Sequence, residues 1–531
     1  MEEMTAPQKE KHALVDTFAK GTLYKFGSMG IIKAISFITT LLIINFLLPA
    51  QADLFFEANA IAITLSSFCG LGLSVAAIRY IPAYMVKKEF GKVKTQIWTS
   101  IAALAGICII VAIFAVIFEQ TFADYYGAGI IPLIPLCMIG MTGLIFLVYL
   151  GSTLNALKQF GVSSAASAAM AVLKVILIGG VIAAGIGTAY TIMGAFAASQ
   201  AIVAMYMMWH IYGKFKEHEN AAKFDFGILR RDAAFGLPVY ISGMLDTLVT
   251  QIDVLMIGIF LGENPGVVAG YSAVVLIVRN IGPMIFSPIS DVQQPMLVEH
   301  FEAKNEFTSN IIRETTRWTM YLGIPFLCMF LIFSAPILQI MAKPYWENAW
   351  LVWAFAPFVI STLVSISSRN ALLARGHVKI LLVVSAIAVG LNVVLNIVLI
   401  PIIGVLGAAI ASSIAAVIGE SYAVIKARQM VGARLHPDIL KAFAAGAVMV
   451  GLSFIALPGM GSIFDFSMQG IIQLVIAVCI SYVIYGIAFL VVKGINAKDW
   501  HMIYVFLEKN KLGIVVSYLK PVSDALCKYT G

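Results

Sequence analysis

The sequence predicts an all-α polytopic membrane protein with fourteen transmembrane helices, and three observations support this class. Hydrophobic residues make up 60% of the 531 residues and charged residues only 12%, whereas about a quarter of the residues in a soluble domain are charged. Apolar runs of about 20 residues, the length that spans a bilayer, recur from one end of the chain to the other. Basic residues then fall almost entirely on one side of the resulting topology.

Fourteen apolar segments are predicted to span the membrane. The first carries Lys33 about 15 Å from its start, at 1.5 Å per residue, and therefore close to the midplane. A charge at that depth costs about 2.5–3.5 kcal/mol, so we expect Lys33 to face a polar chamber. A structural ion pair, or a side chain that reaches toward the cytosol, is the alternative. The segments cover residues 23–48, 54–78, 97–118, 130–152, 161–186, 189–212, 235–261, 267–290, 318–342, 348–368, 380–403, 406–427, 442–458 and 469–492.

The distribution of Lys and Arg tests this count. If the N-terminus is cytosolic and the chain alternates, cytosolic segments hold 31 of the 35 basic residues and external loops hold one, Lys343. The other three, Lys33, Lys174 and Arg279, lie inside spans. This is the positive-inside pattern, which a missed or additional helix would scramble. Both termini are therefore predicted to be cytosolic.

Weak internal repetition suggests two six-helix lobes of parallel order, related by a pseudo-two-fold axis. Tyr24-x-x-Gly27 matches Tyr240-x-x-Gly243, and Pro49 matches Pro265, both at an offset of 216 residues. Shared composition is the alternative explanation for so faint a repeat. The predicted organisation is a cytosolic tail (1–22), an N-lobe (23–212), a cytosolic linker (213–234), a C-lobe (235–428), two added helices (442–492) and a cytosolic tail (493–531).

Few charged residues lie inside the predicted spans, so each is a candidate for function. We expect the cations to attract an anionic group, and the carboxylates to balance them or to bind a coupling cation. Asp246 and Asp253 share one helix face, and Arg279 lies in the next span, so an ion pair can form between them. Pairwise neutralisation between helices is the structural alternative. The candidates for substrate binding are Lys33, Arg79, Lys174, Arg279, Asn392 and Asn396, and those for ion coupling or charge pairing are Asp246, Asp253 and Glu420.

The sequence contains no enzyme constellation. It lacks a P-loop, an H-E-x-x-H motif and a nucleophile elbow at a suitable place. The six cysteines show no C-x-x-C pair and no metal-ligand spacing, so we expect small core residues. No catalytic residue, metal or cofactor is predicted, and the basic residues at the membrane edges do not indicate nucleic-acid binding. A cation gradient or the membrane potential would drive any transport.

Four motifs carry a family resemblance. They are Gly70-Leu-Gly-Leu-Ser-Val-Ala-Ala-Ile-Arg79-Tyr-Ile-Pro, Asp253–Gly262 with Gly270-Tyr-Ser-Ala273 after it, Leu373-Ala-Arg-Gly-His377, and Asn392…Asn396…Pro401 followed by Gly404–Ala411. Together they resemble the polysaccharide transporter, or oligosaccharide flippase, family of the multidrug/oligosaccharidyl-lipid/polysaccharide (MOP) exporter superfamily. The likeness runs from about Phe18 to Arg428.

The resemblance implies two lobes around a central cavity that opens alternately to either side of the cell membrane. It implies a flippase that moves a polyprenyl-(pyro)phosphate-linked oligosaccharide from the inner to the outer leaflet, for cell-surface polysaccharide or glycan biosynthesis. Unsatisfied sugar hydroxyls cost several kcal/mol each in hydrocarbon, so a wet, cationic chamber would lower the barrier. The expected partners are this lipid, membrane lipids and a coupling cation, H⁺ or Na⁺, with glycan-assembly enzymes as further candidates.

Two other functions stay open. A cation-coupled multidrug exporter of the same superfamily is expected to have deep carboxylates in the first lobe, where this chain has Lys33 and Lys174. A non-transporting scaffold for glycan-assembly enzymes would have all its polar membrane residues paired, and no chamber.

Overall fold

The described part of the chain is almost entirely helical. The structure is a computed structural model that describes residues 32, 35–215, 224–279, 293, 297, 308–456, 468–495 and 500. No strand occurs among these residues, and twelve of their helices are long and apolar enough to cross a membrane. The predicted class, an all-helical multi-pass membrane protein, is thus confirmed.

The count of fourteen spans stays a prediction. The twelve candidate helices overlap twelve of the fourteen predicted segments. The other two segments, 23–48 and 267–290, extend beyond the described residues. Within those two segments the structure describes the shorter apolar helices Ile35–Phe46 and Val267–Arg279.

The chain forms two compact units. The first comprises residues 1–276 and 385–415, and the second comprises residues 277–384 and 416–531. The boundaries predicted for an N-lobe, a linker and a C-lobe stay predictions.

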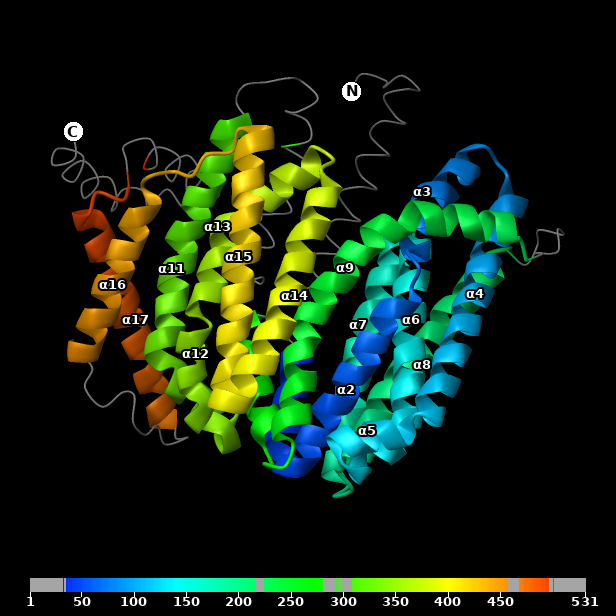
Figure 1. The fold of residues 1–531 in the computed structure, drawn as a ribbon, viewed down its shortest axis with the longest axis horizontal. Coiled ribbons are helices and arrows are strands. Elements are labelled where there is room, and N and C mark those ends of the chain that lie inside the picture. The colour runs from blue at the N-terminus through cyan, green and yellow to red at the C-terminus, as the bar shows by residue number, and fades with distance from the viewer. Residues whose placement is uncertain are drawn as a thin grey trace, which may run out of the picture. The chain divides into compact units, whose positions relative to one another are not determined.

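The first unit is a bundle in which α6 packs against α8, α2, α3 and α4, and in which α9 packs against α2 and α3 (Figure 1). It also includes residues 385–403 of α14 and 405–415 of α15. Its helices are α2 (Pro49–Cys69), α3 (Leu73–Val86), α4 (Phe90–Ile117), α5 (Glu119–Tyr126), the 3₁₀ helix η1 (Ala128–Leu133), α6 (Ile134–Ala156), α7 (Phe160–Ala183), α8 (Ala189–Phe215) and α9 (Phe226–Leu261).

A break between α2 and α3 turns one predicted span into two helices. Leu71 and Gly72 have φ values of 46° and 72°, in the left-handed region that interrupts a right-handed helix. Gly72 tolerates this conformation because it has no Cβ. α9 begins at Phe226, within the predicted linker, because the Asp225 carboxylate accepts hydrogen bonds from the N–H groups of Gly227 and Ile228.

The second unit surrounds a core formed by α11, α13, α16 and α17, with Met320, Phe333 and Met449 among its fully buried residues. α11 contains Pro336 and leaves helical geometry at Phe333, because proline removes a helical hydrogen bond and clashes with the preceding turn. The helices of this unit are α11 (Thr308–Met341), the 3₁₀ helix η2 (Lys343–Trp350), α12 (Leu351–Ala354), α13 (Ala356–Ala374), α16 (Ile439–Ala456) and α17 (Met468–Val491). It also includes residues 378–384 of α14 (Val378–Ile403) and 416–431 of α15 (Val405–Val431).

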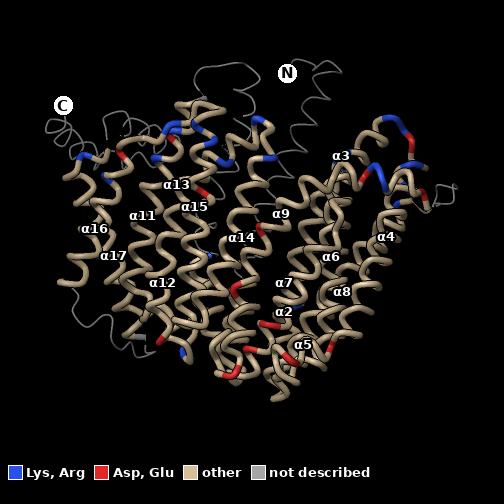
Figure 2. The backbone as a smooth tube through the Cα atoms, viewed as in Figure 1, with Lys and Arg blue, Asp and Glu red and all other residues tan. Residues whose placement is uncertain are grey.

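Most basic residues of the first unit gather at one end (Figure 2). Lys87 and Lys88 lie in the turn between α3 and α4, and Glu119 and Asp124 lie in α5, beyond the far end of α4 (Figure 2). The 28 residues of α4 correspond to a length of about 42 Å at 1.5 Å per residue. The basic end and the acidic end of this unit are therefore one membrane thickness apart.

Candidate functional site

A fully buried carboxylate on α9 is the centre of a polar cluster inside the first unit. Asp253 has no exposed surface. Its Oδ1 accepts hydrogen bonds of 2.9 Å from the side-chain amides of both Asn392 and Asn396. Its Oδ2 accepts from the hydroxyl of Tyr271, at 2.6 Å, and from the hydroxyl of Ser412. Four hydrogen-bond donors from three other helices thus surround the two oxygens of one buried carboxyl group.

The acidic face predicted for α9 is directed toward α14. Asp246, two turns before Asp253, accepts a 2.6 Å hydrogen bond from the hydroxyl of Ser385 on α14. Ser385 and Asn392 lie seven residues apart on α14, so the two helices meet along matching polar faces. The pairing of either carboxylate with Arg279 stays a prediction.

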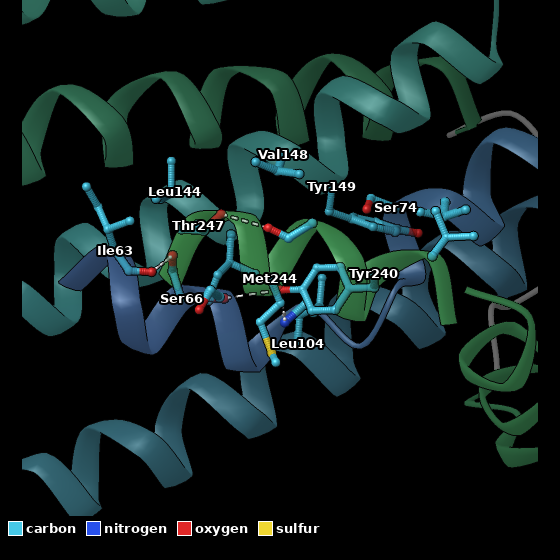
Figure 3. Close-up of a pocket in the computed structure, with 16 residues that line it drawn as sticks. Ile63, Ser66, Ser74, Leu104, Leu144, Val148, Tyr149, Tyr240, Met244 and Thr247 are labelled. Carbon is cyan, nitrogen blue, oxygen red and sulfur yellow. Dashed lines mark hydrogen bonds between the residues drawn. The ribbon is translucent and has the colours of Figure 1, made fainter. Parts of the chain in front are cut away.

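A pocket of about 450 Å³ lies elsewhere in this unit, between α2, α3, α4, α6 and α9 (Figure 3). Most of the residues that line it are apolar, and none of them is charged. Its polar groups are the hydroxyls of Ser66, Ser67, Ser74, Tyr149, Tyr240 and Thr247. This pocket is therefore not the cationic chamber predicted from the sequence, which stays a prediction.

Tyr240 closes one side of the pocket and connects α9 to the break between α2 and α3. Its hydroxyl accepts a 3.0 Å hydrogen bond from the N–H of Gly70 and donates to the carbonyl of Ser66 at 3.3 Å (Figure 3). One turn earlier on α9, the backbone of Gly236 touches the backbone of Gly72 so closely that a Cβ on either residue would overlap the other. Glycine at both positions lets the two backbones meet.

Replacing Tyr240 with phenylalanine should lower the stability of the purified protein. The change leaves the N–H of Gly70 without its acceptor, which costs about 1–3 kcal/mol for a buried group. A loss of 1 kcal/mol lowers Tm by roughly 2–4 °C in a domain of 150–250 residues. Thermal unfolding in detergent measures the shift, with Tyr212→Phe, at an exposed position, as the control. Equal Tm values for the two variants would contradict this assignment.

Two cation–aromatic contacts join the basic end of α3 to α9. The guanidinium of Arg79 lies 4.3 Å from the centre of the Phe235 ring, and that of Arg231 lies 4.0 Å from the centre of the Tyr80 ring. Asp232 is buried beside them, bonded to Arg231 and to the amide of Gln96 at 2.7 Å. Arg79 itself is exposed, one turn from Val75 at the edge of the pocket, so it remains accessible to an anion.

Lys174 on α7 is buried, with 8% of its surface exposed. Its ammonium lies 5.0 Å from the centre of the Phe196 ring on α8, and no carboxylate of the described residues lies within 4.0 Å of it. Such a cation is costly in the membrane unless a ring face, water or a ligand compensates its charge. The role of Lys174 in binding an anion stays a prediction.

The remaining candidates are Lys33, Arg279 and Glu420. Lys33 lies outside the described residues. In the second unit, the guanidinium of Arg279 lies 5.4 Å from the centre of the Phe358 ring. Glu420 forms a 2.8 Å ion pair with Arg369, which corresponds to the charge-pairing alternative for that residue.

Sequence reasoning missed Tyr271 and Ser412 as partners of Asp253. Both occur in or next to the motifs that carry the family resemblance, since Tyr271 follows Gly270 and Ser412 follows Ala411. The signal that could have indicated them was a hydroxyl-bearing residue within a run of mostly small and apolar residues. Only the folded chain shows that these hydroxyls meet a carboxylate 18 and 159 residues away.

Comparisons with known proteins give a fold and a family. The fold is similar to that of the lipid II flippase MurJ in an inward closed conformation, with a TM-score of 0.69, 15% identity and coverage of 88% of this chain and 98% of that chain. It is also similar to multidrug resistance MATE family transporters of the MOP superfamily. The inward-facing one has a TM-score of 0.60, 14% identity and coverage of 75% of this chain and 94% of that chain. The outward-facing one has a TM-score of 0.57, 14% identity and coverage of 78% of this chain and 96% of that chain.

At such identities the structural likeness establishes the fold alone. No curated protein matches the sequence. The family model described as polysaccharide biosynthesis protein matches residues 18–301, which is more than half of the chain. The chain therefore belongs to the polysaccharide biosynthesis protein family.

Proposed function

We propose that the protein is a flippase that moves a polyprenyl-(pyro)phosphate-linked oligosaccharide from the inner to the outer leaflet of the plasma membrane by alternating access. One observation carries this proposal: a polysaccharide biosynthesis family match combined with the fold of a lipid II flippase, over 98% of that flippase's length. Sugar hydroxyls and a phosphate cannot cross hydrocarbon unaided, because each unsatisfied polar group costs several kcal/mol. We further propose fourteen spans in two six-helix lobes plus two helices, with both termini cytosolic.

The intramembrane cations are the proposed phosphate-binding groups. Lys174 supports this role best among the described residues, because it is buried beside an aromatic ring and away from carboxylates. Arg79, exposed at the basic end of α3, would contact the phosphate as it enters. Lys33 and Arg279 are proposed for the same role on the strength of their positions in the sequence.

The Asp253 cluster is the proposed site of cation coupling. Two side-chain amides and the Ser412 hydroxyl lie within hydrogen-bond distance of the oxygens of the Asp253 carboxylate. The Oδ1 of Asn396 is buried, and no group of the described residues donates a hydrogen bond to it. Oxygen donors of this kind suit a hard cation, and rotation of the two amides would direct further oxygens toward it. A proton on Asp253 would neutralise the same charge. Asp246, on the same face of α9, is proposed to assist.

A cation-coupled multidrug exporter is the second candidate, and the likeness to MATE transporters favours it. The two functions differ in what accumulates when the protein is removed. Loss of a flippase leaves lipid-linked oligosaccharide in the inner leaflet, which mass spectrometry of extracted lipids detects. Loss of a multidrug exporter instead increases drug sensitivity and leaves these lipids unchanged, a result that would reject the flippase.

Replacing Lys174 with glutamine should reduce translocation by at least about tenfold, equivalent to 1.4 kcal/mol of lost charge interaction. Lys174→Arg keeps the charge and should retain part of the activity. The readout is the amount of inner-leaflet lipid-linked oligosaccharide in cells that express equal amounts of each variant. Lys158→Gln, at an exposed position of the same unit, is the matched control. Normal export by the Lys174→Gln variant would remove Lys174 from the substrate path.

A further inference from the structure

Two buried acids lie one turn apart near the acidic end of α2. Asp53 is 7% exposed and Glu57 is 3% exposed. The Asp53 carboxylate accepts hydrogen bonds from the backbone N–H groups of Gly266 and Ala269, the latter at 2.7 Å. Gly266 directly precedes the helix that begins at Val267, and Ala269 lies in its first turn, where helices leave N–H groups unsatisfied. The backbone therefore compensates part of the cost of a negative charge on Asp53.

Glu57 has no such compensation. Among the described residues, no group donates a hydrogen bond to its carboxyl and no Lys or Arg lies within 4.0 Å. Its Oε1 lies against the backbone of α9, since a Cβ added to Gly258 would be 2.6 Å from it. The same added Cβ would lie 2.9 Å from the Tyr126 ring. Glycine at position 258 thus makes room for a carboxyl between α2, α5 and α9.

The neighbouring groups increase the cost of a negative charge at this position. Asp53 is the nearest acid, and the hydroxyl of Tyr126 donates to the carbonyl of Leu255 instead of Glu57. From α6, the thiol of Cys137 donates to the carbonyl of Ala58. Burial raises the pKa of the Tyr126 phenol, and the charge of Glu57 raises it further, so this group stays protonated. No described neighbour can supply a positive charge.

We propose that Glu57 is a proton-binding site that controls the contact between α2 and α9 at the acidic end of the first unit. A neutral carboxyl fits against Gly258, whereas an anion at this position requires water. Binding of a proton closes the contact, and loss of the proton opens it. Since the proposed function needs the two ends of the protein to open in alternation, this site would couple that cycle to a proton gradient. That last step rests on the proposed function, whereas the proton-controlled contact does not.

The test uses the purified full-length protein in lipid nanodiscs. Nitroxide labels at Leu48→Cys, before α2, and Asn264→Cys, after α9, report the distance between the two segments. Both residues are exposed, and the six native cysteines are replaced to avoid stray labels. Pulsed electron paramagnetic resonance then gives the short-distance population between pH 5.5 and 8.5. We expect this population to dominate at low pH. Above the midpoint, the ratio of closed to open forms should fall about tenfold per pH unit, the limit for one proton.

Two variants make the test decisive. Glu57→Gln mimics the protonated carboxyl and should stay closed across the pH range, and Gly258→Ala should displace the carboxyl and stay open. Asp124→Asn, an exposed acid on α5, should titrate as the parent does. Unchanged pH dependence in Glu57→Gln would overturn the proposal. An open contact in Glu57→Gln at low pH would also overturn it, because it would mean that Glu57 is held as an anion by a cation. If the parent protein shows this pH dependence but does not translocate lipid-linked oligosaccharide, the result counts against the proposed function and not against the Glu57 site.

Discussion

Replacing Asp253 with asparagine should abolish ion-coupled translocation while the protein still folds and inserts. The asparagine side chain has nearly the same shape, but it removes the charge and places an amide among four donor groups. Hydrogen bonds to a charged group are worth about 1.5–3 kcal/mol each, so the affinity of the cluster for a cation should fall by more than about tenfold. The measurement is translocation in vesicles with and without an imposed Na⁺ or H⁺ gradient. We expect the dependence on one of these gradients to be lost.

Asp253→Ala separates folding from coupling at the same position. This variant removes the carboxylate that accepts hydrogen bonds from four side chains, and it leaves a buried cavity in its place. The four donors are the amides of Asn392 and Asn396 and the hydroxyls of Tyr271 and Ser412. Each unsatisfied buried group costs about 1–3 kcal/mol, so the alanine variant should be markedly less stable than the asparagine variant. Asp124→Asn, on the exposed surface of α5, controls for the loss of an acid. If Asp253→Asn translocates normally under both gradients, the cluster is a structural network and not a coupling site.

Replacing Gly236 with alanine should strongly destabilise the contact between α9 and the α2–α3 break. A Cβ at this position would overlap the carbonyl of Gly72. Neither partner can yield by changing a rotamer, because both are backbone. Overpacking of this kind costs about 1–3 kcal/mol and sometimes more, and we expect α9 to move away from α3. Thermal unfolding in detergent should show a lower Tm, and the translocation assay should show reduced activity.

Gly243→Ala is the matched control, because it makes the same change two turns later on the same helix. A Cβ at Gly243 would have no other atom within 4 Å, and alanine favours a helix over glycine by about 1 kcal/mol. The two substitutions should therefore shift Tm in opposite directions. A Gly236→Ala variant as stable as Gly243→Ala would show that α9 does not contact α3 closely in the membrane.

Some features of the site could be predicted because they are local. Seven-residue spacing placed Asp246 and Asp253 on one face of a helix, and both carboxylates accept hydrogen bonds from α14. Four-residue spacing likewise placed Asn392 and Asn396 together, and both bind the same carboxylate oxygen. Periodicity reports which residues share a face, since a helix repeats every 3.6 residues. It does not report which helix that face meets.

The sequence by itself determined the class of this protein and the approximate places of twelve spanning helices, because hydrocarbon admits only long apolar segments whose backbone bonds are satisfied internally. Its motifs also indicated the family. The tertiary structure alone decided that Asp253 meets asparagines 139 and 143 residues away and that Gly72 meets Gly236. It also decided that Glu57 is buried, with no Lys or Arg of the described residues within 4.0 Å of its carboxyl. These features depend on close packing between segments distant in sequence. Composition and periodicity do not predict such packing.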